Sequence, residues 1–276
     1  MKIPVTDVGG LSITGPVRPD NQDAILYPDG STSSLPGLLH AVADGMGGYS
    51  HGGVASSQAL QALALTLQKM GGMRPEKALR KGVESANLDV YRTAQKLGAG
   101  RMGTTLTAAY LVGETLHLIH VGDSRAYLVR EGRARCLTSD HTLVADLVRS
   151  RLIGPEKVRT HAQRSILTRA VGLGMFIQPE QVKIRLQADD RLVLCSDGIW
   201  SVVMDDEFAL LAREAPDPRQ LSQALVDLAL ARRTDDNCSV VAVHVPGFTS
   251  GSGAVSQLPG LNLLRRAATD KQEKHP

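Results

Sequence analysis

Four aspartates of this chain each adjoin a short apolar run, and this pattern constrains the fold more than any other. The runs, each with its acid, are residues 38–43 before Asp44, 116–122 before Asp123, 192–196 before Asp197, and 238–243 after Asp236. Runs of this length, rich in Val, Leu and Ile, predict buried strands. Carboxylates gathered at strand ends would repel one another in a site of low dielectric unless cations lay between them. The pattern therefore indicates a metal site, and carboxylates with water favour Mg²⁺ or Mn²⁺, ions that serve phosphate chemistry.

Two of these acids are followed by glycine, at Asp44-Gly45 and Asp197-Gly198. The glycine lets its own carbonyl turn toward an ion, although an Asp-Gly pair alone is equally typical of a turn. Asp236 supplies a third acid, and its neighbour Asp235 is either an alternative ligand or a solvated turn residue. Three acids behind three separate strands are harder to explain as turns.

Four further residues near the acids have candidate roles at the site. Asp123 could hold another ion at the rim of the site, or form a salt bridge to Arg125. Arg18 has the planar fork that grips two oxygens of a phosphate, although an arginine taken alone is more often a surface residue. Asp23 could orient a metal-bound water without touching the metal. His141 is either a group behind the ligands or a surface cap.

Composition limits the functional class. The chain has 276 residues, 42% hydrophobic content, 3% aromatic residues and a net charge of +3. The low net charge and the absence of a basic patch in the sequence argue against a nucleic-acid-binding protein. Three scattered cysteines without a CxxC pair indicate reduced thiols and a cytoplasmic protein, and we expect neither a signal peptide nor a membrane span.

The expected elements alternate between hairpins and helix pairs. Strands are expected at residues 3–14, 23–27, 38–43, 104–112, 115–121, 125–130, 133–137, 181–187, 190–195 and 238–245, and helices at 60–70, 75–97, 141–150, 205–214 and 218–231. Residues 44–53 are predicted to be a glycine-rich loop, 151–165 a surface flap, and 181–195 a hairpin. This order favours an α+β fold with antiparallel sheets. A domain at 1–246 would precede a disordered tail at 247–276, unless residues 258–266 dock on a partner.

Motifs of competing chemistries are missing from the sequence. The glycine-rich loop has no Walker A lysine, and neither a G-x-S-x-G elbow nor an H-E-x-x-H helix occurs. The His and Cys spacing typical of zinc is also missing.

Eight segments, in order, resemble the metal-dependent PP2C (PPM) family of serine/threonine protein phosphatases in its bacterial form. They are RPDNQD (18–23), VADGMGG (42–48), GTT (103–105), VGDSRAY (121–127), LTSDH (137–141), LTRAVG (167–172), SDGIW (196–200) and DNCS (236–239). The resemblance covers residues 8–245. It implies two antiparallel β-sheets packed as a sandwich, flanked by helix pairs on both sides.

The resemblance also implies a binuclear site with Mn²⁺ or Mg²⁺, two per site, and a third position. The implied metal ligands are Asp44, Gly45 through its carbonyl, Asp197 and Asp236, with Asp123 at the third position and Arg18 binding phosphate. The chain departs from the family at Gln22, where Glu is frequent, and at Tyr49, where many bacterial members have His. Tyr49 and His51 are therefore both candidates for the general acid.

The function implied is hydrolysis of phosphoserine and phosphothreonine in proteins by a metal-activated water, reversing a serine/threonine kinase. The expected partners are phosphorylated proteins, the kinase or its substrates, with neither nucleic acid nor membrane, and the expected state is a monomer. The alternatives are a non-catalytic phosphoprotein-binding module of the same fold and a metal-dependent esterase or nuclease.

Overall fold

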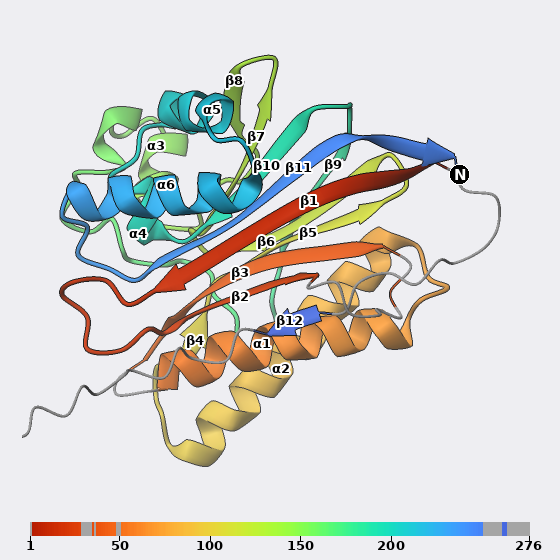
Figure 1. Cartoon of the computed structure of the whole chain (residues 1–276). Coiled ribbons are helices and arrows are strands. Elements are labelled where there is room, and N and C mark those ends of the chain that lie inside the picture. The colour runs from red at the N-terminus through yellow and green to blue at the C-terminus, as the bar shows by residue number, and fades with distance from the viewer. Residues whose placement is uncertain (1, 29–34, 36, 48–50, 251–260, 264–276) are drawn as a thin grey trace, which may run out of the picture.

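Four layers make up the protein: two antiparallel sheets packed face to face, with a helix pair outside each (Figure 1). The computed structural model describes residues 2–28, 35, 37–47, 51–250 and 261–263. The first sheet has the order β1 (Lys2–Ile13), β11 (Cys238–Ser250), β10 (Asp190–Cys195), β7 (Arg125–Arg130) and β8 (Arg133–Cys136). The second has the order β12 (Leu261–Leu263), β2 (Asp23–Pro28), β3 (Leu38–Met46), β5 (Leu106–Val112), β6 (Thr115–Val121) and β9 (Glu180–Arg185), with β4 (Gly103–Thr104) paired to the end of β3. The predicted α+β sandwich is confirmed.

Helices cover the outer faces of both sheets. The long helices α1 (His51–Lys69) and α2 (Pro75–Leu97) pack on the second sheet, and α5 (Asp205–Glu214) and α6 (Pro218–Ala231) pack on the first. Shorter elements are α3 (Leu143–Arg149), the 3₁₀ turn η1 (Pro155–Lys157) and α4 (Asp197–Trp200). Local chemistry sets the helix ends: Pro75 opens α2, and Gly98 ends it with a left-handed φ of 61°.

Strand β3 explains why the strands read as unbroken apolar runs. Leu39 and Ala41 belong to the core under α1 and α2, whereas Leu38 and Val42 belong to the core between the sheets. Both faces of the strand are buried, so apolar residues do not alternate with polar ones. The strand thereby becomes a rigid support for Asp44 near its end.

The predicted hairpin at residues 181–195 is wrong. Strand β9 pairs with β6 in the second sheet, whereas β10 pairs with β7 and β11 in the first. The reason lies in burial: β10 is buried on both faces and needs a central position, whereas β9 is a half-exposed edge strand. The chain therefore crosses between sheets there, and Asp189 adopts a φ of 64° at the crossing.

The prediction that residues 44–53 form one loop is also wrong, because β3 continues to Met46 and α1 already begins at His51. Two glycines let the strand and helix approach closely. A Cβ added to Gly45 would lie 2.0 Å from the Gly52 carbonyl oxygen, and one added to Gly52 would lie 2.6 Å from the Gly45 oxygen. Glycine here permits packing rather than loop formation.

The C-terminal part of the chain continues the fold past residue 246. Strand β11 extends to Ser250, and β12 pairs antiparallel with β2 and forms the edge of the second sheet. Residues 251–260 and 264–276, which make up most of the predicted tail, lie outside the described residues.

Candidate metal centre

Five aspartates come to the same end of the sandwich from different elements. Asp23 on β2 and Asp44 on β3 are direct cross-strand partners. Asp197 is the first residue of α4, two residues after the end of β10, and Asp236 lies two residues before β11. Asp123 lies between β6 and β7. Residues more than 200 positions apart in sequence are thus brought into one electrostatic environment.

The carboxyl pKa values show how closely these acids interact. Burial raises the pKa of Asp44 well above its usual range, and the charges of Asp23 and Asp197 raise it further. Burial, then the charges of Asp236 and Asp23, raise the pKa of Asp197 to about 7. Burial is also the main cause that raises the pKa of Asp23 to about 6. Like negative charges held close together in a poorly solvated site favour the binding of protons or cations.

Two carboxylate oxygens of this cluster have no hydrogen-bond partner within the described part of the chain. They are Oδ1 of Asp23 and Oδ1 of Asp197, and both are buried. A buried, unpaired carboxylate oxygen is costly, and a hard divalent cation is the partner that such a donor set suits. The residues present therefore fit the implied metal ions.

Arg18 lies at the edge of the acid cluster. Its Nη2 is 2.6 Å from Oδ2 of Asp236, and about half of the Arg18 side chain is exposed. The hydrogen bond to Asp236 is the main cause that raises the pKa of Arg18. The guanidinium is therefore charged, next to the acids and accessible from solvent, as a phosphate-binding arginine must be.

The backbone of Asp44 is held by the threonines of the GTT segment. The Asp44 N–H donates to Oγ1 of Thr105, and the Asp44 carbonyl accepts from Oγ1 of Thr104 and from the Thr105 N–H, all at 2.8 Å. Gly45 continues the strand and is buried. With its backbone fully satisfied, Asp44 presents its side chain from a fixed position.

Sequence reasoning missed two supporting residues. Asn237 accepts the Gln22 N–H at 2.9 Å and donates to the Asp20 carbonyl at 3.1 Å, so it ties the Arg18 loop to the Asp236 segment. Ser196 donates its hydroxyl to Oδ2 of Asp23 at 2.8 Å. Each lies next to a predicted ligand and inside a segment of the family resemblance, but neither was given a role from the sequence.

The structure separates some of the alternatives left open by the sequence. No ion pair joins Asp123 to Arg125 within the described residues, because the Arg125 guanidinium engages Asp140 at 2.9 and 2.7 Å. Asp235 is exposed and pairs with Arg164 at 3.4 Å. His51 is half-buried at the start of α1, where its Cβ lies near Gly47. Tyr49 lies outside the described residues.

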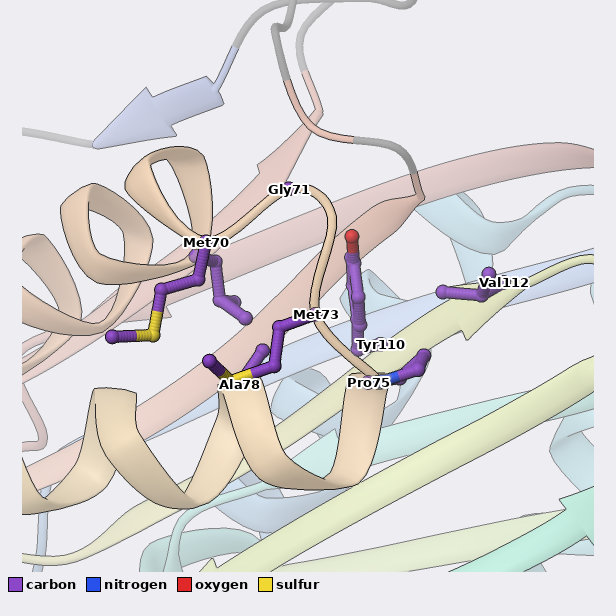
Figure 2. Close-up of a pocket in the computed structure, with 8 residues that line it drawn as sticks. Met70, Gly71, Met73, Pro75, Ala78, Tyr110 and Val112 are labelled. Atoms are coloured by element: carbon purple, nitrogen blue, oxygen red, sulfur yellow. The ribbon is translucent and has the colours of Figure 1, made fainter.

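Two cavities in the described part of the chain lie away from the acids. One, of about 130 Å³, lies between the α1–α2 turn and β5 and is lined mainly by apolar side chains, including Met70, Met73 and Tyr110 (Figure 2). The other is an open surface groove beside the start of α2, lined in part by Arg74, Lys183 and His117. Within the described residues, no helix combines the length and apolarity needed to cross a membrane.

Residues 17–238 match the family described as Protein phosphatase 2C. The chain belongs to this family. The match spans all five clustered aspartates and Arg18, so the whole cluster lies within the matched segment.

Relatives and solved structures agree with this assignment. The chain is 36% identical over 252 residues to the serine/threonine protein phosphatase PstP of Mycobacterium tuberculosis, covering 88% of this chain and 46% of the relative. It therefore spans about half the length of that relative. The structure of serine/threonine phosphatase Stp1 from Staphylococcus aureus has a TM-score of 0.82 at 30% identity, over 90% of this PP2C chain and 98% of the other.

A third comparison bears on the metal. The catalytic domain of PstP in complex with two manganese ions has a TM-score of 0.76 at 32% identity, over 87% of this chain and 98% of the other. A similar PP2C fold thus holds manganese.

Proposed function

We propose that this PP2C chain hydrolyses phosphoserine and phosphothreonine in proteins with the help of divalent metal ions. The observation that carries the proposal is the convergence of five aspartates, two of them with buried, unpaired oxygens. Arg18 beside Asp236 adds the cation that a phosphate ester requires. The names of the relatives, serine/threonine phosphatases, support the same substrate class.

The ligands of the ions would be Asp44, the Gly45 carbonyl, Asp197 and Asp236, with Asp123 and Asp197 sharing a third position. Two ions, Mn²⁺ or Mg²⁺, fit this number of carboxylates when water fills the remaining positions. Such ions would supply the nucleophile by lowering the pKa of a bound water toward neutrality.

The side chains of the protein would orient and stabilise the reacting groups. The Arg18 fork would bind two phosphoryl oxygens and stabilise the charge that develops on them. Asp23, fixed by the Ser196 hydroxyl, would orient the attacking water. The leaving serine or threonine oxygen needs a proton, for which His51, Tyr49 and a metal-bound water are the candidates. In this scheme the phosphoryl group passes directly to water.

A direct test measures phosphate release from a phosphoserine or phosphothreonine peptide. Asp44→Asn and Asp197→Ala should each lower kcat/KM by more than the roughly 10- to 100-fold that loss of an outer metal-site partner costs. Asp236→Asn should do the same, whereas Asp235→Asn is the matched control, because Asp235 is exposed and pairs only with Arg164 within the described residues. Unchanged turnover in the Asp44 or Asp197 variant would refute the metal assignment.

Chelation provides an independent test of the same proposal. EDTA should stop turnover, and added Mn²⁺ or Mg²⁺ should restore it, because the carboxylates alone cannot activate water. Activity that survives EDTA contradicts the proposal. Comparing a phosphopeptide with a phosphotyrosine peptide and a phosphodiester separates this function from that of an esterase or nuclease. Mn²⁺ binding without any turnover would instead favour the non-catalytic alternative.

The finer biological assignments belong to the same proposal. We propose a phosphorylated kinase or its substrates as partners, a monomeric state and a cytoplasmic location. The three cysteines are free, which supports a reducing compartment.

A further inference from the structure

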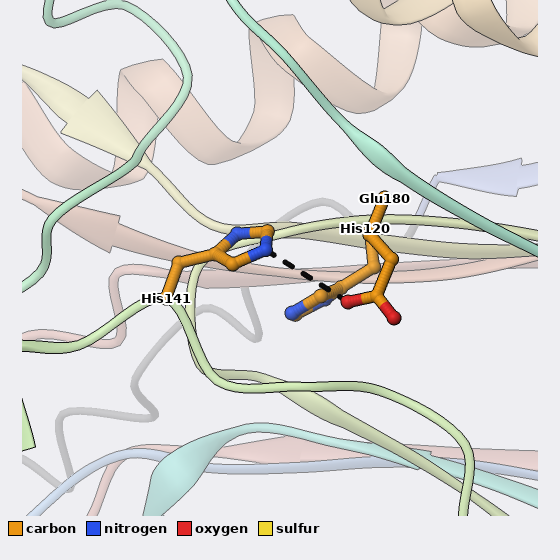
Figure 3. Close-up of side chains that lie close together, drawn as sticks. All are labelled: His120, His141 and Glu180. Carbon is orange, nitrogen blue, oxygen red and sulfur yellow. Dashed lines mark ion pairs between the residues drawn. The ribbon is translucent and has the colours of Figure 1, made fainter. Parts of the chain in front are cut away.

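Three side chains that often bind metals gather away from the aspartates, at the junction of β6, β9 and the LTSDH segment. His120, His141 and Glu180 each place one nitrogen or oxygen within 4.8 Å of the others (Figure 3). His120 and His141 are both at least 98% buried. Their rings lie 4.8 Å apart, and Nε2 of His141 is 3.8 Å from the Glu180 carboxylate.

The positions of the protons argue against a metal ion here. The Gly122 N–H can only donate, so Nδ1 of His141 accepts it at 3.1 Å, and the proton of the neutral ring is on Nε2. An ion bound at Nε2 would force that proton onto Nδ1, where it would face another N–H. The His141 ring therefore serves the backbone of Gly122 rather than an ion, and burial lowers the pKa of His141 to about 3.

What His141 holds is the residue before Asp123. The His141 ring accepts the Gly122 N–H, and the His141 N–H donates to the Gly122 carbonyl at 2.7 Å. Gly122 has a φ of 106°, and a Cβ there would lie 2.6 Å from the Thr105 side chain. Both backbone groups of a sharply bent glycine are thus fixed by a single residue.

The rest of this loop is held in the same way. Nε1 of Trp200 donates to the Asp123 carbonyl at 2.8 Å, and Oγ1 of Thr107 donates to the Ser124 carbonyl at 2.9 Å. Trp200 in turn packs under the Arg125 guanidinium, 3.6 Å from the ring centroid. Each of the three carbonyls from Gly122 to Ser124 therefore accepts a hydrogen bond, so the backbone that carries Asp123 is held in place.

We propose that His141 is a positioning residue for Asp123: its two hydrogen bonds to Gly122 fix the Asp123 carboxylate where it binds the third divalent ion. The inference rests on the proposed function, which gives Asp123 its ion. A metal ligand whose backbone is already ordered loses less conformational entropy when the ion binds. Removing the His141 side chain should therefore weaken ion binding, and not only the stability of the fold.

Two substitutions of His141 separate positioning from packing. In His141→Asn the side-chain oxygen occupies the place of Nδ1 and can still accept the Gly122 N–H, whereas in His141→Gln the oxygen lies near the place of Nε2. Mn²⁺ binding is measured by titration calorimetry without substrate. We expect His141→Gln to weaken the Asp123-dependent binding step about 10-fold or more, and His141→Asn to recover most of this loss. Glu180→Gln is the matched control and should leave all Mn²⁺ steps unchanged.

Asp123→Asn defines the step in question. We expect it to abolish that step, and His141→Gln added to it should have no further effect on the remaining Mn²⁺ binding. Equal Mn²⁺ affinities of wild type and folded His141→Gln, equal losses in the Asn and Gln variants, or a further loss in the Asp123→Asn background would each overturn the proposal. If His141→Gln fails to fold, His141→Ala takes its place. A binding isotherm for His141→Ala equal to that of the wild type overturns the proposal, and a selective loss of the Asp123-dependent Mn²⁺ binding step supports it. Because binding is measured without turnover, an inactive wild type would refute the proposed function alone.

Discussion

His40 is a polar residue in an apolar environment. It is fully buried in β3 between Leu38 and Val42 of the inter-sheet core, and neither ring nitrogen has a hydrogen-bond partner among the described residues. Burial lowers the pKa of His40 to about 3. An unpaired buried polar group costs about 1–3 kcal/mol, so this residue should reduce the stability of the protein.

We predict that His40→Leu increases the free energy of unfolding, and more so at acid pH. The folded pKa of about 3 lies below the ordinary value of 6.5, so between these values only the unfolded chain binds the proton. Stability is therefore lost as pH falls through this window, by about 2 kcal/mol at about pH 5 for this residue. Urea unfolding of both proteins at about pH 7.5 and about pH 5 measures the difference. A difference that does not grow at the lower pH contradicts the prediction.

At the scale of elements, the contact between β3 and α1 depends on the missing side chain of Gly52. Replacing a helical glycine by alanine usually stabilises by about 1 kcal/mol. Here the new Cβ would lie 2.6 Å from the Gly45 oxygen, a proposed metal ligand. We expect Gly52→Ala to destabilise by roughly 1–3 kcal/mol and to weaken Mn²⁺ binding. Urea unfolding and calorimetry measure both effects. Gly100→Ala is the control, because a Cβ at Gly100 meets nothing within 4 Å; equal effects of the two substitutions would refute the packing argument.

The elements that could be predicted are those whose signals are local. The turns at residues 113–114 and 131–132 were predictable because Gly113 and Gly132 favour positive φ, here 59° and 72°. The apolar runs likewise predicted the strands that carry the aspartates. The sheet assignment of β9 and β10 was not predictable, because it depends on which partner strands bury each of them.

The roles of the supporting residues at the candidate site could not be predicted from the sequence for a similar reason. Ser196 and Asp23 are 173 positions apart, and Asn237 and Gln22 are 215 apart. No spacing rule links such pairs. The acids were recognisable because a carboxylate beside an apolar run is unusual by itself, whereas a serine or asparagine there is common.

For the whole molecule, the aspartate cluster should make stability depend on both metal and pH. The folded pKa values of Asp197 and Asp23, about 7 and 6, exceed the ordinary value of 3.8. The metal-free folded state thus retains protons that the unfolded chain has lost, and stability falls as pH rises through this window. Bound Mn²⁺ replaces those protons, so it should raise Tm more at about pH 7.5 than at about pH 5. Scanning calorimetry in EDTA and in Mn²⁺ measures this, and a larger gain at the lower pH would refute it.

The contact of Arg18 with Asp236 has a consequence for how the site fills. The guanidinium and an incoming divalent ion would compete for the same carboxylate, so Arg18, the residue proposed to bind phosphate, would also oppose metal binding. Arg18→Ala should therefore bind Mn²⁺ more tightly while its KM for phosphopeptide rises, opposite movements that titration calorimetry and steady-state kinetics can record. If Arg18 has both roles, a single side chain balances metal retention against substrate capture, and the response of the protein to scarce manganese depends on that balance.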